Sequence, residues 1–398
     1  MFGNLISRLA DPLGRSAPLF PPLVCGVGSP LIMTKRKPLV VESFKIQVAD
    51  EVLDNLKSRL RGTRWPDQIP GIGWAQGTEL DWLQHRVSYW ADHFDWRAWE
   101  QRLNALDQFT WEGIHFVHQR ATSRRGIPLI LTHGWPSSFL DYLDMLPLLE
   151  HFDVVVPSLP GYGFSLRPPK VGINYRYVAE RWHKLMSELG YSAYAAAGYD
   201  FGAGVTTFLA LDHPASVMGI HLTTLESDLA PMIDEANWSE EERSYLASHR
   251  RWEATERGYS AIQSTKPQTI GYALNDSPAG LAAYLGEKWH SWSDATPPDD
   301  FLCATFTLYW VTQTVTSSMR DYWDNRWHAA APSYVGVPTA FGLFANQTIP
   351  EGEPPRSYLE RVYNIKRWTV FPRGGHFAPA EEPGAVAQDL TAFFRDLG

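Results

Sequence analysis

From residue 127 onward the sequence alternates short apolar segments with amphipathic ones, and this alternation limits the chain to a mostly parallel sheet covered by helices. Parallel neighbours need a crossover between them, usually a helix, so strand and helix signals take turns along the chain. The strands are predicted over residues 128–132, 154–157, 193–198, 218–222, 339–344 and 368–371. The expected fold class is therefore α/β.

The alternation stops once, between residues 229 and 331, where a long helical stretch rich in Tyr and Trp intervenes. An insertion late in an open α/β sheet lies over the carboxyl ends of its strands, where such sheets bind ligands. We therefore predict a helical lid over 229–331. It separates two parts of one catalytic domain, 121–228 and 332–398.

Residues 38–120 are predicted to form a mostly helical N-terminal region. A strand-like segment over 44–48 comes before an amphipathic helix over 51–61, which Asp50 is placed to cap. Whether this region wraps the lid or associates with a membrane surface is open. Its tryptophans at helical spacing are interpreted as core residues, namely Trp82, Trp90, Trp96 and Trp99.

The first 37 residues are rich in Pro, Gly and Leu and are predicted to be a disordered leader. Prolines break the apolar stretch 18–32, so it makes a poor signal peptide, and Met33 offers an alternative start. Two cysteines as far apart as Cys25 and Cys303 favour a reducing compartment. We expect a cytoplasmic protein, with a targeting leader as the alternative.

The net charge of −9 provides no basic surface for phosphates, which argues against a nucleic-acid partner. No apolar run reaches the roughly 20 residues that span a bilayer, so no transmembrane anchor is predicted. The 17 Trp, 17 Tyr and 19 Phe suit either an aromatic core or an apolar cavity for a ligand. Composition alone leaves both interpretations open.

Asp200 stands where an apolar strand, 193–198, gives way to a helix-compatible run, 205–211. The surrounding sequence, 198–202 (GYDFG), has the strand-turn-helix setting of a nucleophile elbow, with Asp where Ser is more frequent. The residue at such a tip has strained dihedrals, so its neighbours must be small. Asp200 is therefore a candidate nucleophile.

Segments before and after this elbow supply the other parts of a hydrolytic site. The sequence 133–136 (HGWP) closes the first predicted strand, which places the backbone amide of Trp135 beside that of Phe201 as an oxyanion hole. His376 follows the last predicted strand after two glycines, where a general base is expected. No metal or cofactor is implied.

These segments resemble the microsomal, juvenile-hormone and fungal branch of the epoxide hydrolases, from about residue 38 to the C-terminus. The matching segments are 133–136 (HGWP), 157–165 (PSLPGYGFS), the Asp200 elbow, 264–272 (STKPQTIGY) and 373–377 (RGGHF). The resemblance implies an α/β-hydrolase fold with a helical lid and a helical N-terminal region. It also implies that a small apolar epoxide reacts with water to give a diol.

The resemblance further implies roles for four side chains. Asp200 is the nucleophile that forms an alkyl ester, His376 activates water, and Tyr259 and Tyr322 donate hydrogen bonds to the epoxide oxygen. The choice of Asp is chemically sound, because its ester keeps a carbonyl that water can attack, whereas a Ser nucleophile would leave an unreactive ether.

One position departs from the family pattern. The carboxylate that orients the histidine is expected just after the strand 339–344, where this chain has Gln347. An amide can accept the imidazole N–H but cannot stabilise an imidazolium by charge. A carboxylate could instead come from Glu351 or Glu353 on the same loop, or from Glu226 after another strand.

Two other functions remain open from the sequence. A haloalkane dehalogenase shares the Asp nucleophile, although it usually has Asn where this chain has Trp135. A catalytically impaired binder of an apolar ligand is the second alternative, and Gln347 motivates it. A homodimer is also open.

Overall fold

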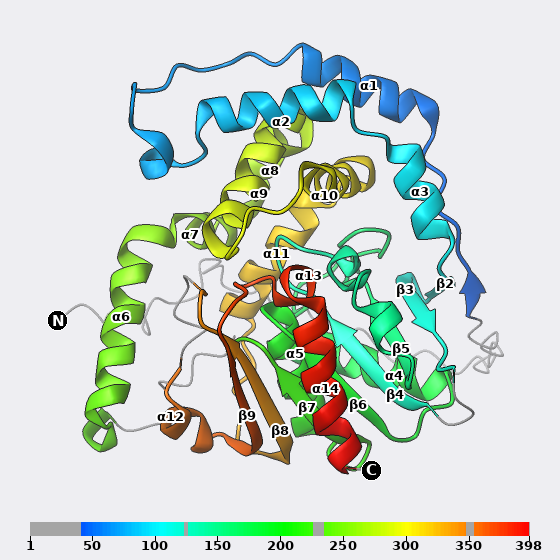
Figure 1. Ribbon diagram of the computed structural model, residues 1–398, viewed down its shortest axis with the longest axis vertical. Coiled ribbons are helices and arrows are strands. Elements are labelled where there is room, and N and C mark those ends of the chain that lie inside the picture. Colours follow the sequence, from blue (N-terminus) through cyan, green and yellow to red (C-terminus); the bar gives the residue numbers. More distant parts are fainter. Residues whose placement is uncertain (1–40, 123–125, 226–234, 348–353, 398) are drawn as a thin grey trace, which may run out of the picture. The chain divides into compact units, whose positions relative to one another are not determined.

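The computed structural model describes residues 41–122, 126–225, 235–347 and 354–397. The strands are β1 (Glu42–Ser43), β2 (Gln108–Trp111), β3 (Ile114–Gln119), β4 (Ile127–Thr132), β5 (Phe152–Pro157), β6 (Tyr194–Gly198), β7 (Val217–Leu222), β8 (Val335–Phe344) and β9 (Tyr363–Phe371). They form one sheet in the order β1-β2-β3-β5-β4-β6-β7-β8-β9 (Figure 1). All neighbours from β5 to β9 are parallel, whereas β1, β2, β3 and β5 pair antiparallel. The predicted mostly parallel sheet is confirmed.

The central strands are buried on both faces, as continuous apolar runs in a parallel sheet require. In β4, for example, Leu129, Ile130 and Leu131 have no exposed surface. All six predicted strands are present, and β8 and β9 begin several residues earlier than predicted. The edge strand β9 is more exposed, which weakened its apolar signal in the sequence.

The predicted strand over residues 44–48 is wrong, because β1 ends at Ser43. The amide of Phe44 still donates to the carbonyl of Gln108 in β2 at 2.8 Å, but the next two inward-facing amides bond to side chains of helix α3 (Trp96–Asn104). The amide of Ile46 donates to Asn104 Oδ1 at 2.8 Å, and that of Val48 donates to Glu100 Oε1 at 2.7 Å. Apolar alternation therefore signalled burial here, but not sheet pairing.

The predicted cap of the first helix is also wrong. Helix α1 (Asp50–Arg61) has Ala49 at its N-cap position, without a side-chain hydrogen bond. The carboxylate of Asp50 pairs with Arg97 instead. In the first turn, the negative charge of Asp50 still interacts favourably with the positive end of the helix dipole.

The hairpin of β2 and β3 was missed in a region that the sequence marked as mostly helical. Its two strands are joined at Glu112 and Gly113, whose φ angles of 46° and 78° suit a tight hairpin turn. The Glu-Gly pair between aromatic and β-branched residues was the signal that could have identified it.

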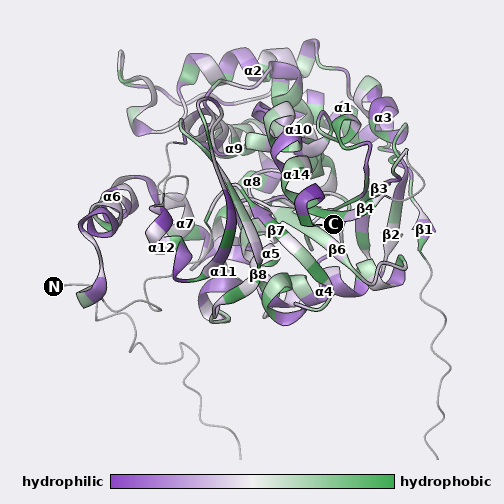
Figure 2. Ribbon diagram, turned by 60° about the horizontal axis from the view of Figure 1, so that its bottom comes forward, coloured by the Kyte–Doolittle hydropathy of each residue, from purple (hydrophilic) through white to green (hydrophobic). Residues whose placement is uncertain are grey.

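Helices α4 (Tyr175–Glu188), α5 (Phe201–Asp212) and α14 (Pro383–Leu397) pack along the sheet (Figure 1). Of these, α5 is buried over nearly its whole length, while α4 keeps one polar face. Figure 2 shows the central strands coloured mainly as hydrophobic, whereas the outer helices alternate between hydrophilic and hydrophobic residues. This arrangement fixes the carboxyl ends of β4, β6 and β7 at one edge of the core.

Further helices lie between β7 and β8 in sequence, and others lie between β1 and β2. The inserted helices are α6 (Glu240–Glu256), α7 (Gly258–Gln263), α8 (Pro267–Asp276), α9 (Pro278–Trp292), α10 (Asp299–Thr312) and α11 (Val315–Trp327). The early helices are α1, α2 (Leu80–Asp92) and α3 (Trp96–Asn104), and α2 packs on α9 and α10. Trp90 Nε1 donates to Thr307 Oγ1 at 2.8 Å in this contact. The early helices therefore cover α9 and α10.

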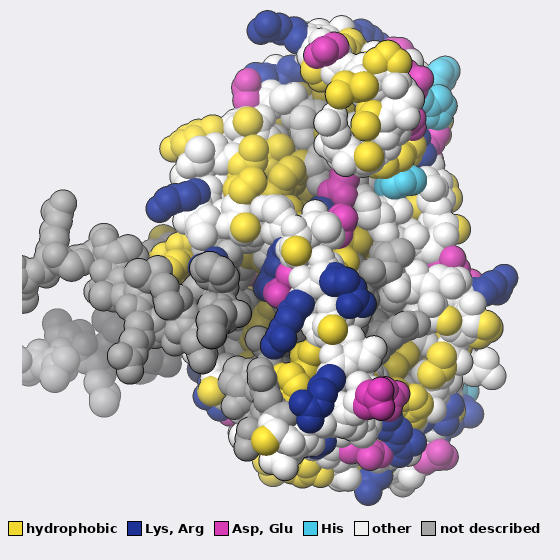
Figure 3. All heavy atoms as spheres, turned by 90° about the vertical axis from the view of Figure 1, so that its left-hand side faces the viewer, with side chains coloured by type: hydrophobic (Ala, Val, Ile, Leu, Met, Phe, Trp, Pro, Cys, Tyr) yellow, Lys and Arg dark blue, Asp and Glu magenta, His cyan; other side chains and the backbone are white. Residues whose placement is uncertain are grey.

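No helix in the described ranges combines the length and apolar character needed to cross a membrane. On the face drawn in Figure 3, basic and acidic side chains are interspersed with apolar ones. The predicted leader, with Met33 and Cys25, lies outside the described residues.

Candidate active site

Asp200 lies at the sharp turn between β6 and α5. Its φ of 51° and ψ of −132° fall in a region that L residues rarely adopt. The backbone amide of Asp200 donates to Thr224 Oγ1 at 2.7 Å, which ties the turn to the segment after β7. The turn holds the carboxylate at the carboxyl edge of the parallel sheet, the geometry expected of a nucleophile elbow.

Two glycines permit the close packing around this turn. A Cβ on Gly202 would overlap the backbone carbonyl of Thr132, and a Cβ on Gly134 would overlap the Asp200 side chain. Both positions therefore exclude any side chain.

The two oxygens of the Asp200 carboxylate have different partners. Oδ1 accepts the backbone amides of Trp135 at 2.8 Å and Phe201 at 2.7 Å. Oδ2 lies 3.2 Å from Nε2 of His376. One oxygen therefore occupies the predicted oxyanion hole, and the other faces the predicted base.

The loop that supplies the Trp135 amide is held by a buried imidazole. His133 Nε2 accepts the amide of Leu159 at 3.1 Å, and Nδ1 lies 3.0 Å from the carbonyl of Gly134. Burial lowers the pKa of His133 to about 4, so the ring is neutral near pH 7 and can serve as donor and acceptor at once.

His376 follows β9 and is almost fully buried. Its backbone amide donates to the carbonyl of Trp292 at 2.8 Å, which fastens the histidine loop to the end of α9. The rings of these two residues lie 5.1 Å apart between centroids. The structure thus brings Asp200 and His376 together in one aromatic-lined site.

Glu381, which the sequence interpretation missed, organises the same loop. Its carboxylate accepts the backbone amides of Gly375 at 3.2 Å and Phe377 at 3.0 Å, one on each side of His376. It also accepts the amide of Asp294 at 2.7 Å. Burial raises the pKa of Glu381. Nothing in the local sequence marked this residue, because its role depends on the path of the loop.

The second ring nitrogen of His376, Nδ1, is buried and has no hydrogen-bond partner among the described residues. Gln347 is also buried, and its Nε2 donates to the carbonyl of Thr223 at 3.1 Å. Its Oε1 likewise lacks a partner within the described ranges. The other candidates for orienting His376, namely Glu226, Glu351 and Glu353, lie outside the described residues.

Tyr259 on α7 and Tyr322 on α11 lie over the residues of the oxyanion hole. The Tyr259 ring stacks on Trp135, with centroids 5.4 Å apart and an interplanar angle of 6°. The Tyr322 ring meets Phe201 edge to face at 4.7 Å. The two tyrosine rings are 5.7 Å apart. Residues from two inserted helices therefore converge above the Asp200 carboxylate.

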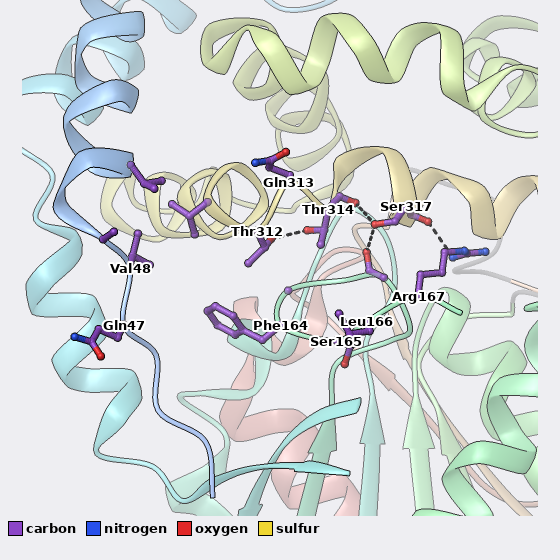
Figure 4. Close-up of a pocket in the computed structure, with 15 residues that line it drawn as sticks. Gln47, Val48, Phe164, Ser165, Leu166, Arg167, Thr312, Gln313, Thr314 and Ser317 are labelled. Atoms are coloured by element: carbon purple, nitrogen blue, oxygen red, sulfur yellow. Dashed lines mark hydrogen bonds between the residues drawn. The ribbon is translucent and has the colours of Figure 1, made fainter. Parts of the chain in front are cut away.

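Arg167 fastens α11 to the catalytic sheet. This buried guanidinium, in the segment after β5, bonds to Asp321 at 2.5 Å and Asp324 at 2.7 Å. It also donates to the carbonyl of Ser317 at 2.9 Å, as Figure 4 shows. Because Asp321 directly precedes Tyr322, this cluster positions the tyrosine. No local pattern in the sequence indicated this cluster, because the partners lie about 150 residues apart.

The groove drawn in Figure 4 is separate from this site. It has a volume of about 510 Å³ and is open to solvent, and its walls include Gln47, Phe164, Leu166, Thr312 and Ser317. None of the candidate catalytic residues lines it. The candidate catalytic residues therefore lie outside this groove.

A buried carboxyl group lies beneath the site. Tyr199, next to the candidate nucleophile, hydrogen-bonds through its hydroxyl to Asp141, and the same hydroxyl lies 2.7 Å from Ser137 Oγ. Burial raises the pKa of Asp141 to about 7, because no cation faces it among the described residues.

We expect Asp141→Asn to stabilise the protein increasingly as the pH rises. The folded-state pKa of Asp141, about 7, exceeds the unfolded value of about 3.9, so the folded state binds the proton more tightly and wild-type stability falls between pH 4 and 7. The variant should gain about 2 kcal/mol relative to wild type between pH 5 and pH 8.

Denaturant unfolding of both proteins at the two pH values measures this difference. The half-exposed Asp92→Asn serves as the matched control, because its carboxylate lies at the surface beside Arg61. A stability difference for Asp141→Asn that is the same at pH 5 and pH 8 would contradict the expectation.

Comparison with known proteins gives consistent matches. A family model described as "Epoxide hydrolase N terminus" matches residues 41–142, and one described as "alpha/beta hydrolase fold" matches residues 127–268. Epoxide hydrolase 1 of Sus scrofa is 33% identical, over 89% of this chain and 88% of the relative. Juvenile hormone epoxide hydrolase 2 of Ctenocephalides felis is 32% identical, over 87% and 84%.

The solved structure of Aspergillus niger epoxide hydrolase is also similar. It has a TM-score of 0.80 at 30% identity, covering 90% of this chain and 97% of that chain. Together with the match to the fold model, this similarity confirms the predicted α/β-hydrolase fold.

Proposed function

Since this chain belongs to the epoxide hydrolase family, we propose that Asp200 opens the epoxide by forming an ester and that His376 then directs the hydrolysis of this ester to a diol. The observation that carries the proposal is the divided environment of the carboxylate. Oδ1 accepts two backbone amides, whereas Oδ2 faces the imidazole.

In the first step, Oδ2 of Asp200 attacks an epoxide carbon and the carbon–oxygen bond of the ring breaks. The electron pair goes to the epoxide oxygen, which takes a proton from a tyrosine hydroxyl. We assign this donation to Tyr259 and Tyr322, because their rings lie above the two residues of the oxyanion hole. A phenol stays protonated near pH 7 and can still protonate a strongly basic alkoxide.

In the second step, His376 removes a proton from water, and the resulting hydroxide attacks the ester carbon of Asp200. The ester carbonyl oxygen is Oδ1, which already accepts the amides of Trp135 and Phe201. These donors stabilise the oxyanion as it forms. When the oxyanion collapses, the bond between the ester carbon and the alkyl oxygen breaks, the diol leaves as the alcohol, and the Asp200 carboxylate is regenerated. In comparable sites the loss of one such donor slows the reaction by about 10²–10³-fold.

The substrate is proposed to be a small apolar epoxide, with water as the co-substrate. Aromatic rings surround the carboxylate, including those of Trp135, Trp292 and both tyrosines. Such a lining favours apolar groups and offers few fixed polar partners besides those that act in the reaction.

We further propose the domain division predicted above, with a lid over 229–331 and an N-terminal region over 38–120. The inserted helices α7 and α11, which carry the two tyrosines, support the lid assignment. The cytoplasmic location and the homodimer remain predictions.

Oxygen labelling tests the proposed pathway. Enzyme in excess is mixed with styrene oxide in ¹⁸O-labelled water for one turnover, and the diol and the peptide containing Asp200 are analysed by mass spectrometry. Attack through an ester leaves the label in Asp200 and an unlabelled first diol. A labelled first diol with an unlabelled Asp200 would mean that water attacks the epoxide directly.

Two further measurements address the two alternative functions. The relatives reported above are named as epoxide hydrolases, and none of them supports haloalkane dehalogenation. Halide release from haloalkanes would support that activity. A binder without catalysis would form neither ester nor diol.

We also propose that Oε1 of Gln347 accepts the Nδ1 proton of His376 through one bridging water. Within the described residues, Gln347 Oε1 is an acceptor without a partner, His376 Nδ1 is a ring nitrogen without a partner, and both residues are buried. This bond would fix the tautomer in which Nε2 can take a proton from water.

We expect Gln347→Glu to raise the rate of ester hydrolysis several-fold. A carboxylate stabilises the imidazolium that forms, and the reverse change in serine proteases lowers kcat by about 10⁴. Stopped-flow measurement of ester decay reports the effect, with the exposed Gln101→Glu as the control. Unchanged decay would indicate that another carboxylate already serves His376.

A further inference from the structure

Lys288, on α9, is a buried cation that the reaction described above does not use. Its side chain is only 7% exposed, which is unusual for lysine. Its Nζ lies 4.4 Å from the centroid of the Tyr259 ring and 5.6 Å from that of Trp292. The ammonium therefore lies against a ring of the candidate active site.

The neighbouring carboxylate of Glu287 pairs with this ammonium but is placed differently. The Glu287 side chain is 20% exposed and also accepts the hydroxyl of Ser291 at 3.1 Å. Water therefore screens the carboxylate more than the ammonium, so the field of the pair at Tyr259 is net positive.

We propose that the Lys288 ammonium assists epoxide opening by stabilising the negative charge that develops on the Tyr259 hydroxyl as it gives its proton to the epoxide oxygen. This inference rests on the proposed function. Lys288 does not contact the reacting atoms; it is a positioning residue that acts on Tyr259 through its charge. The phenolate recovers its proton from solvent or from the imidazolium of His376, so the cycle adds only water to the epoxide.

The location of the charge determines which step should respond. Ring opening places negative charge on the epoxide oxygen and on the tyrosine hydroxyl, whereas ester hydrolysis places it on Oδ1 of Asp200 in the oxyanion hole. A cation beside Tyr259 therefore favours alkylation more than hydrolysis. Because Lys288, Asp200 and His376 are buried, a full charge a few ångströms away changes such a rate by about tenfold or more.

Stopped-flow tryptophan fluorescence with styrene oxide measures the two steps separately. We expect Lys288→Met to slow alkylation about tenfold and to leave ester hydrolysis within about twofold. Lys288→Arg keeps the charge and should stay within about threefold of wild type. Lys184→Met, at an exposed lysine paired with Glu180, is the matched control and should change neither step.

A double-mutant cycle separates this role from packing. If Lys288 acts through Tyr259, the effect of Lys288→Met on alkylation should fall below about twofold in the Tyr259→Phe background. A tenfold loss that persists in that background would show that the lysine supports the fold instead. An unchanged alkylation rate in the single variant would also overturn the proposal.

Glu287→Gln supplies a test that does not remove the buried cation. It should speed alkylation a few-fold, because the positive charge near Tyr259 is then no longer offset. Slower alkylation in this variant would contradict the proposal even if Lys288→Met fails to fold. Mass spectrometry of wild type separates failure of the proposed pathway from failure of the role of Lys288. A missing ester on Asp200 overturns the pathway. An ester on Asp200, without coupling between Lys288 and Tyr259, overturns only the role of the lysine.

Discussion

Asp200→Ala is expected to lower kcat for epoxide opening by about 10⁴-fold or more, with no ester detectable on the protein. The reason is that the only carboxylate held between the two amides and His376 is removed, and no other side chain in the described part of the chain occupies that position. Diol formation from styrene oxide and mass spectrometry of the quenched protein measure the two effects.

The matched control for this variant is Asp212→Ala at the other end of α5, where the carboxylate pairs with Arg176 at the surface. It should retain activity within about twofold, because exposed ion pairs contribute little. Substantial diol formation by a folded Asp200→Ala protein would show that the nucleophile lies elsewhere.

His376→Gln is expected to separate the two steps of the reaction. Alkylation of Asp200 should remain within about tenfold of wild type, whereas ester hydrolysis should fall by about 10⁴-fold, because no group is left to take a proton from water. The alkyl-enzyme should therefore accumulate to one equivalent. Rapid quench followed by mass spectrometry detects the added mass.

His213→Gln, at the C-terminal end of α5, provides the control for an imidazole that pairs with a carboxylate outside the site. It should turn over without accumulating ester. Equal slowing of alkylation and hydrolysis in His376→Gln, with no trapped ester, would contradict the assigned role of the base.

The parts of the structure that follow from local patterns could be predicted from the sequence. The buried strands of the parallel sheet have short apolar runs, and the elbow at Asp200 requires glycines that the sequence displays. His376 could be placed because its loop follows the last strand in a fixed order. These features depend on neighbours within a few residues.

Features that depend on contacts between distant segments could not be predicted. Arg167 looks like an ordinary surface arginine until α11 brings Asp321 and Asp324 against it. Lys288 looks equally ordinary until α9 lies beside Tyr259. The segment 44–48 was misassigned for the same reason, since the partners of Ile46 and Val48 are side chains of a helix more than 50 residues away.

The packing of α2 against α9 and α10 has a consequence for how new substrate preferences arise. Trp90 and Trp82 press on Thr307 and Gly286, so the placement of α9, and with it Lys288 and Trp292, is inherited from a stretch of chain some 200 positions earlier. Substitutions in α2 can therefore change substrate selectivity, although this helix does not contact the epoxide. Mutagenesis restricted to residues that line the active site would miss these positions on α2.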